Sequence, residues 1–352
     1  MHHEIVALER LMQPLPPSFD FPPHVTYTLT SYDHTLPADV AARVRNATII
    51  IVTTARIDAA TLHPAVTPHL RLVAVMAAGT DPVDLAACRK RGLRVTNCPA
   101  ANLDAVSESA LSLYFAARRR TVLLDGLVRQ VPSEWKTHGS LGKHLKFADG
   151  KPPLTCGDEV LGVVGYGGLG GCNNPVVVSR QLTTDGGGCR QAHCSPRTRP
   201  GHASPHRRAK TALPHRDDRV PFDQVLRRCT VLVLSLPRNP ETLNLLSTRE
   251  FETMSPYAVL VNISRGGIVN EAAVVQALRA GQIAGYATDV FEQEPVEGPG
   301  DTPLLGDEAK GLNITLSPHL AWLSQRTVRN LGQILKDTVE AWVNEQEMNV
   351  VV

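Results

Sequence analysis

A glycine-rich turn follows an apolar run in the middle of the chain. The run EVLGVV at residues 159–164 leads into GYGGLG at residues 165–170, which has the spacing G-x-G-x-x-G. Glycines at such a turn let the backbone approach a pyrophosphate, whose oxygens bind the N–H groups at a helix start. The motif is common, but its place after a predicted strand makes it a candidate dinucleotide site. Its assigned cofactor-binding residues are Gly165, Gly167, Gly168, Leu169 and Gly170.

Three later segments place charged and polar residues in a fixed order. They are AVLVNISRGGIVNEAAVVQAL at 258–278, DVFEQEP at 289–295 and TLSPHLAW at 315–322. In order and spacing they resemble the three signature segments of the D-isomer-specific 2-hydroxy-acid dehydrogenases. Residues 79–108 resemble that family's hinge and substrate loop, and the similarity covers nearly the whole chain except about residues 171–218.

The resemblance implies an oxidoreductase that acts on a small molecule. Such enzymes reversibly reduce a small 2-oxo acid, for example glyoxylate or hydroxypyruvate, to the D-2-hydroxy acid. NAD and NADP both remain open as the cofactor. The resemblance further implies a homodimer.

The same resemblance assigns catalysis to Arg265, Glu294 and His319. Reduction of a 2-oxo acid needs a cation that holds the carboxylate and polarises the ketone, and the planar fork of an arginine matches a carboxylate. It also needs a proton donor near neutral pH, which is the range in which histidine titrates. We expect Glu294 to pair with His319 and to raise its pKa.

Further substrate contacts follow from the resemblance. The backbone N–H groups around Ala78 and Gly79 correspond to the loop that holds the substrate carboxylate, where glycine permits close approach. Trp322 follows His319 in the pattern HxAW, and it either flanks the substrate pocket or packs in the core.

Three more positions are assigned to the cofactor. Ser235 and Pro237 lie after the apolar run TVLVLSL, in the loop that borders the cofactor ribose in this family. Asp289 opens DVFE and corresponds to the residue near the nicotinamide carboxamide, although an aspartate at a strand end is also an ordinary cap.

Short apolar runs alternate with helical stretches on both sides of the glycine turn, which predicts two doubly wound parallel sheets. We expect a flavodoxin-like fold for the substrate domain and a Rossmann fold for the dinucleotide-binding domain. By resemblance the substrate domain comprises residues 1–103 and 323–352, with residues 104–322 forming the dinucleotide-binding domain. A predicted helix over 105–120 ends in three arginines, which we interpret as complementing the helix dipole rather than as an anion site.

One segment departs from this pattern. Residues 183–212 contain no large apolar side chain, so we expect a disordered or non-native loop where the family has its second strand. We predict a helix for VVVSRQL at 176–182, after Pro175, and no strand beside the run 159–164. Asp185 stands at the offset of a ribose-binding acid, but no strand delivers it. The cysteines and histidines between 189 and 206 lack zinc-finger spacing, so we expect no metal site.

Bulk properties restrict the possible partners. The 352 residues carry a formal net charge of +2, which is too small to predict binding to nucleic acid or an anionic membrane. No run approaches the length of a membrane span, and we expect no membrane partner. The seven cysteines are odd in number and scattered, as in a reducing compartment, so we expect a cytoplasmic protein.

Two other functions stay open at this stage. The C-terminal-binding-protein corepressors share the pattern HxAW and keep the same three catalytic residues, so an NAD(H)-sensing binding protein is an alternative. A dehydrogenase with impaired cofactor binding is another, because the departure at 171–218 adjoins the glycine turn. A turnover assay beside a peptide pull-down separates the first alternative from catalysis.

Overall fold

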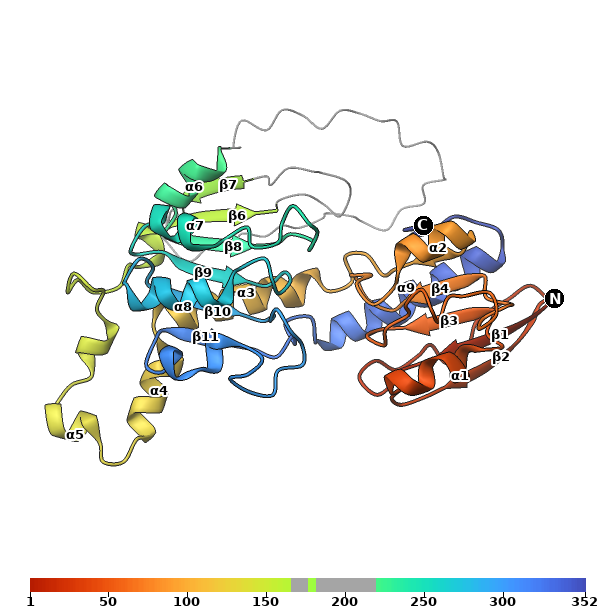
Figure 1. Ribbon diagram of the computed structural model, residues 1–352, viewed down its shortest axis with the longest axis horizontal. Helices are drawn as coiled ribbons and strands as arrows, with labels where there is room; N and C mark the ends of the chain where they lie inside the picture. The colour runs from red at the N-terminus through yellow and green to blue at the C-terminus, as the bar shows by residue number, and fades with distance from the viewer. Residues whose placement is uncertain (166–176, 182–219) are drawn as a thin grey trace. The chain divides into compact units, whose positions relative to one another are not determined.

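The computed structural model describes residues 1–165, 177–181 and 220–352, and for 177–181 it describes the backbone only. Contacts divide the chain into two units (Figure 1). Unit 1 comprises Met1–Ser107 and Trp322–Val352, and unit 2 comprises Glu108–Ala321. The expected loop at 183–212, Asp185 and the cysteines and histidines between 189 and 206 lie outside the described residues.

Unit 1 is built on a parallel sheet with the strand order β2-β1-β3-β4-β5, which is the flavodoxin-like order. Its strands are β1 (His2–Ala7), β2 (Thr26–Ser31), β3 (Ile49–Val52), β4 (Leu72–Val75) and β5 (Arg94–Thr96). Its helices are α1 (Val40–Val44), α2 (Leu85–Arg91) and α9 (Gln325–Val343).

Strand β3 shows why this sheet is covered on both faces. All four of its side chains are buried. Ile50 and Val52 pack in one apolar cluster with residues of α1 and α2, whereas Ile49 and Ile51 pack in another with residues of α9. Because successive side chains of a strand point to opposite faces, a strand buried on both sides must be apolar throughout.

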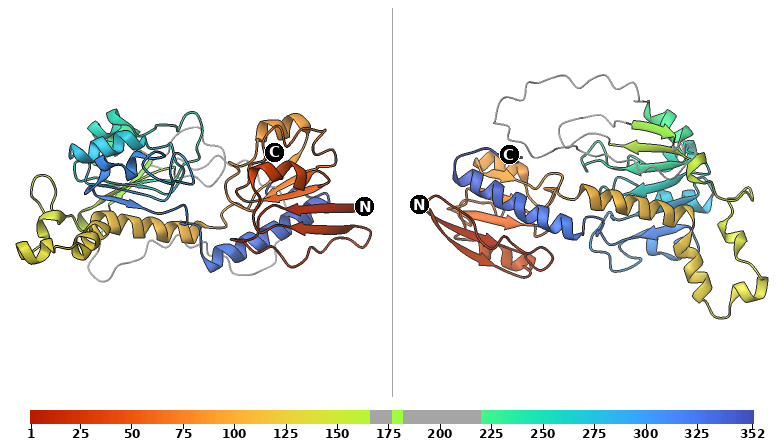
Figure 2. Two further views of the ribbon diagram at one scale, coloured as in Figure 1. Left: turned by 60° about the horizontal axis from the view of Figure 1, so that its bottom comes forward. Right: turned by 180° about the vertical axis from the view of Figure 1, so that it is seen from behind.

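Unit 2 contains a six-stranded sheet with the order β11-β10-β9-β8-β6-β7. Its strands are β6 (Val160–Val164), β7 (Val177–Gln181), β8 (Val231–Leu234), β9 (Val259–Asn262), β10 (Gly285–Thr288) and β11 (Ile314–Leu316). Its helices are α4 (Thr121–Arg129), α5 (Glu134–His138), α6 (Phe222–Arg228), α7 (Thr248–Thr253) and α8 (Glu271–Arg279), together with most of α3 (Leu103–Arg118). Helices α6, α7 and α8 cover one face and α3 covers the other (Figure 2).

Strand β7 corrects the prediction made for residues 176–182. These residues do not form a helix, because Val177–Gln181 pair antiparallel with β6. The prediction that β6 lacks a neighbour on this side is therefore wrong. The physical reason lies in the backbone of β6, whose polar groups require partners, and in adjacent β-branched valines, which favour a strand.

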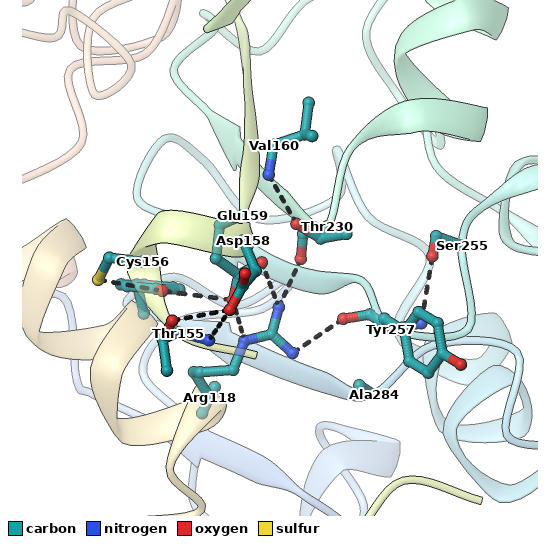
Figure 3. Close-up of polar contacts among 12 residues, drawn as sticks. Arg118, Thr155, Cys156, Asp158, Glu159, Val160, Thr230, Ser255, Tyr257 and Ala284 are labelled. Carbon is teal, nitrogen blue, oxygen red and sulfur yellow. Dashed lines mark hydrogen bonds and ion pairs between the residues drawn. The ribbon is translucent and has the colours of Figure 1, made fainter. Parts of the chain in front are cut away.

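A buried ion pair anchors α3 to the sheet (Figure 3). The guanidinium of Arg118 donates to the carboxylate of Glu159 at 2.9 Å, to the carbonyl of Thr230 at 2.8 Å and to the carbonyl of Tyr257 at 2.9 Å. These residues directly precede or lie near the starts of β6, β8 and β9. Arg118 lies in the last turn of α3, as the interpretation of a complement to the helix dipole expects, and its charge is in addition buried against Glu159.

Helices α4 and α5 extend away from the sheet of unit 2 (Figure 2). Neither helix has a buried residue. Several large apolar side chains of this arm and of α3 are exposed, namely Leu111, Phe115, Val122, Val128, Val131 and Trp135. The sequence patterns did not lead us to predict either helix.

Candidate active site

Several polar residues of unit 2 lie at the carboxyl ends of parallel strands. Gly165 follows β6, Ser235 follows β8, Arg265 lies after β9, Asp289 follows β10 and His319 lies after β11. These strands are neighbours in the sheet, so their carboxyl ends form one edge. Ligands of open α/β sheets bind at this edge.

A buried amide holds the turn that carries Arg265. The side chain of Asn262 accepts hydrogen bonds from the N–H of Ser264 at 3.1 Å and from its hydroxyl at 2.8 Å. It also donates to the carbonyl of Arg265 at 3.1 Å. The half-buried side chain of Arg265 is therefore presented from a rigid turn at the end of β9.

Gly266 brings this turn against the loop that carries Glu294. A Cβ atom at Gly266 would collide with the backbone carbonyl of Phe291. In that loop, the N–H of Phe291 donates to Glu294 Oε1 at 2.8 Å. Because any larger residue at 266 would push the two loops apart, glycine is required for Arg265 and Glu294 to keep their relative positions.

The carboxylate of Asp289 organises the turn that carries His319. It accepts from the hydroxyl of Ser317 at 2.6 Å, from the N–H of Leu320 at 3.0 Å and from the N–H of Ala321 at 2.9 Å. The N–H of His319 donates to the backbone carbonyl of Asp289 at 2.7 Å. These bonds hold His319 at φ +55°, a left-handed conformation that is uncommon for residues other than glycine.

His319 and Glu294 form a direct pair. Nδ1 of His319 lies 2.7 Å from Glu294 Oε2, and the two side chains are 42% and 33% exposed. The hydrogen bond from Glu294 raises the pKa of His319 above its ordinary value, against an opposing effect of burial. Burial by itself would raise the pKa of Glu294, but hydrogen bonds from His319 and Phe291 and the charge of Arg265 lower it. The pair therefore favours an imidazolium beside a carboxylate.

The described part of the glycine turn also fits a cofactor edge. Gly165 has φ +99°, and a Cβ atom there would collide with the carbonyl of Ser235 in the adjacent loop. Pro237 lies further along that loop and accepts a hydrogen bond from the Thr242 hydroxyl at 2.9 Å. The other assigned glycine-turn residues, Gly167, Gly168, Leu169 and Gly170, lie outside the described residues.

The three residues assigned to substrate lie in unit 1. Ala78 and Gly79 are half-buried and follow β4, and the carbonyl of Ala78 accepts from the side chain of Asn97 at 2.7 Å. Trp322 is half-buried and packs against the apolar cluster that includes residues of α9. This contact supports the core-packing alternative for part of its surface.

Sequence reasoning missed the residues that position the catalytic candidates. Asn262, Ser317 and Glu271 received no role, although Glu271 is buried and accepts from the N–H of Glu292 at 2.8 Å and from the Thr302 hydroxyl at 2.6 Å. A polar residue that closes a fully apolar strand, as in AVLVN, is the signal that points to Asn262. For Glu271 no such signal exists, because an acid at a helix start is ordinary.

The fold and the site together define a nucleotide-binding α/β oxidoreductase, and comparisons with known proteins agree. Residues 196–321 match the family model described as D-isomer specific 2-hydroxyacid dehydrogenase, NAD binding domain. Glycerate dehydrogenase from Methylorubrum extorquens is 31% identical over 334 residues, which are 95% of this chain and 93% of that protein. Glyoxylate reductase from Korarchaeum cryptofilum is 31% identical, over 84% of this chain and 79% of that protein.

Solved structures share the fold. The NADPH-dependent glyoxylate/hydroxypyruvate reductase from Sinorhizobium meliloti, in complex with NADP and malonate, superposes with a TM-score of 0.66 at 22% identity. The match covers 99% of this chain and 97% of that one. The chain therefore belongs to the D-isomer-specific 2-hydroxyacid dehydrogenases, which are NAD(P)-dependent oxidoreductases of 2-oxo and 2-hydroxy acids. In the described ranges, no helix has the length and apolar character needed to cross a membrane.

Proposed function

We propose that Arg265, Glu294 and His319 catalyse the reduction of a small 2-oxo acid such as glyoxylate or hydroxypyruvate to the D-2-hydroxy acid. The observation that carries this proposal is the 2.7 Å contact between Glu294 and His319 Nδ1, on the same sheet edge as Arg265. With Nδ1 engaged, Nε2 is the nitrogen that delivers a proton to the substrate oxygen, and it has no partner among the described residues. Arg265 binds the substrate carboxylate and polarises the ketone.

NADH or NADPH supplies the hydride when it is bound. The residues that hold it on the described part of the edge are Gly165, Ser235 and Pro237, with the glycine turn up to Gly170 completing the site. We also assign Asp289 to the cofactor set. Its carboxylate determines the position of the turn that carries His319. By the same resemblance, we assign Ala78, Gly79 and Trp322 to substrate binding.

The substitution His319→Ala tests this assignment. We expect turnover to fall by roughly 100- to 10,000-fold, the range for loss of a general acid, with cofactor affinity nearly unchanged. The matched control is His69→Ala, because His69 is exposed and lies in unit 1. Full turnover in the His319 variant refutes the proton-donor assignment, and steady-state kinetics with cofactor titration distinguishes the outcomes.

The proposal includes a homodimer that forms through the exposed apolar arm. Val131 is 92% exposed and Trp135 is 53% exposed, whereas isolated chains rarely leave such apolar side chains clustered on one arm. A second copy is the partner that explains a helix pair without any buried residue. For location we propose the cytoplasm, which suits the four free cysteines of the described ranges.

A further inference from the structure

The carboxylate of Glu9 holds the loop that follows β3, residues 53–56, which we call the β3 loop. Glu9 is half-buried and lies two residues after the end of β1. Its Oε2 accepts from the N–H groups of Thr53 at 3.0 Å, Thr54 at 2.8 Å and Ala55 at 3.1 Å. Its Oε1 accepts from the Thr54 hydroxyl. A carboxylate that accepts from successive N–H groups fixes the backbone that supplies them.

The charge of Glu9 is directed at this loop. Burial by itself would raise the pKa of Glu9, but the hydrogen bonds from Thr54, Ala55 and Thr53 lower it below its ordinary value. The side chain is therefore an ionised acceptor at neutral pH, and charged acceptors form the stronger hydrogen bonds. Within the described ranges Glu9 forms no ion pair, so the donors of the β3 loop are the groups that stabilise its charge.

The β3 loop is joined at both ends to the loop that follows β4, residues 77–81, which we call the β4 loop. At one end the N–H of Met76 donates to the carbonyl of Val52 at 2.8 Å. At the other end the N–H of Ile57 donates to the carbonyl of Pro82 at 2.8 Å. Because both pairs of ends are hydrogen-bonded, the conformation of one loop restricts that of the other.

The carbonyl groups of the β4 loop show where its N–H groups point. The carbonyl of Ala77 accepts from the N–H of Cys98 at 2.9 Å, and that of Ala78 accepts from the side chain of Asn97 at 2.7 Å. Both donors follow β5, whereas β3 flanks β4 on the opposite side. In a trans peptide unit the N–H points opposite to the C=O, so the N–H groups of Ala78 and Gly79 point away from β5, towards the side of the β3 loop. Among the described residues neither N–H has an acceptor.

We infer that Glu9 is a positioning residue for substrate binding, which fixes the β3 loop and through it the N–H groups of Ala78 and Gly79. The inference rests on the proposed function, in which these two N–H groups bind the substrate carboxylate. Glu9 acts through the two backbones and takes no part in the chemistry. Without an acceptor at position 9, three N–H groups lose their partner, the β3 loop relaxes, and the joined β4 loop loses its support on that side.

The substitutions Glu9→Met and Glu9→Gln form a matched pair that tests the inference by steady-state kinetics with glyoxylate. Methionine is similar in length to glutamate but is a poor acceptor, whereas glutamine keeps one oxygen for the three N–H groups. In Glu9→Met we expect KM to rise roughly 5- to 30-fold with kcat and cofactor affinity nearly unchanged, because the carboxylate is bound alike in the ground and transition states. In Glu9→Gln the rise should stay below about threefold.

The substitution Arg91→Met is the control for a general loss of stability in unit 1. Arg91 donates to the carbonyl of Leu62 at 2.8 Å and to the Thr67 hydroxyl at 2.6 Å, and neither loop is among its hydrogen-bond partners. This variant should unfold at a lower temperature and keep the native KM. An unchanged KM in Glu9→Met, or an equal rise in Arg91→Met, overturns the inference.

Hydrogen exchange of the full chain separates this inference from the proposed function, because it needs no turnover. The N–H of Met76 and that of Asp84, which donates to the carbonyl of Ile57 at 2.9 Å, report on the two joined ends. Both should exchange roughly tenfold faster in Glu9→Met than in the native chain or in Arg91→Met. Native exchange rates in Glu9→Met overturn the inference whether or not the chain reduces glyoxylate. A native chain without turnover refutes the proposed function instead, and faster exchange in Glu9→Met then still supports the action of Glu9 on the β4 loop.

Discussion

At the scale of single residues, the geometry of the site depends on which hydrogen-bond partner each polar atom has. Glu294 uses one oxygen for the N–H of Phe291 and the other for Nδ1 of His319. This division fixes the carboxylate in place and leaves Nε2 as the ring nitrogen of His319 without a partner among the described residues. In the proposed mechanism His319 is the proton donor, and the contact with Glu294 raises the pKa that sets the pH range of this role.

The substitution Glu294→Gln tests this adjustment. Reduction needs the imidazolium, so kcat/KM for reduction is full at low pH and falls as pH rises through the pKa of His319. Because Glu294 raises that pKa, its removal should shift the fall to lower pH. The pH profile of reduction measures this shift. An unchanged profile in the variant means that the titrating group is not His319. Glu297→Gln is the control, since Glu297 lies in the same region but is not in contact with His319.

At the scale of elements, two loops meet because one residue lacks a side chain. The turn after β9 carries Arg265, and the loop after β10 carries Glu294. Gly266 allows their backbones to touch. Glu271, at the start of α8, holds the second loop from the other side through its bond to Glu292. The geometry of the proposed site thus depends on backbone contacts between loops as well as on the three candidate side chains.

Gly266→Ala should therefore impair both stability and turnover. A Cβ atom against the carbonyl of Phe291 forces backbone movement, and overpacking of this kind costs about 1–3 kcal/mol. We expect lower thermal stability and a fall in kcat, which thermal unfolding and steady-state kinetics measure. The control is Gly298→Ala, because a Cβ atom there meets nothing within 4 Å. Equal behaviour of the two variants contradicts the role of Gly266.

At the scale of the whole molecule, the antiparallel direction of β7 affects cofactor choice. In this register Val177 lies opposite Val164, so the amino end of β7 is at the cofactor edge and Gln181 is at the other. A parallel second strand would deliver its last residue to the ribose instead. β7 therefore delivers no carboxyl-terminal residue to the cofactor edge.

We therefore expect this chain to discriminate between NADH and NADPH by less than about tenfold, or 1.4 kcal/mol. Calorimetric titration of both cofactors against the full chain measures the ratio. Selectivity of a hundredfold or more for one cofactor contradicts the expectation and means that a residue outside the described ranges reads the ribose.

The arm formed by α4 and α5 gives a second prediction at this scale. The double variant Val128→Glu/Trp135→Glu should weaken the dimer at least about tenfold, because it introduces charges into an apolar contact. Leu11→Glu/Leu36→Glu is the matched control, since both leucines are exposed but lie in unit 1. Sedimentation velocity measures the association. A monomeric native chain, or an arm variant that dimerises as the native chain does, refutes the arm as the interface.

The order and type of most elements could be predicted from the sequence, because hydrophobic periodicity is a local property. Runs such as ATIIIVT and AVLVNIS became buried strands, and the stripe of Leu331, Leu335 and Val339 became the buried face of α9. The order of Arg265, Glu294 and His319 likewise made them candidates, and in the structure they follow the carboxyl ends of β9, β10 and β11.

Only the tertiary structure decided which distant residues meet. Three adjacent arginines look alike in the sequence, yet Arg118 alone of the three is buried, because Glu159 lies at the start of the neighbouring strand. The direction of β7, the three hydrogen bonds of Asp289 and the edge-on contact between His3 and Trp342 have the same origin. Each depends on contacts between segments far apart in the chain, and those contacts follow from topology and side-chain packing rather than from any local pattern.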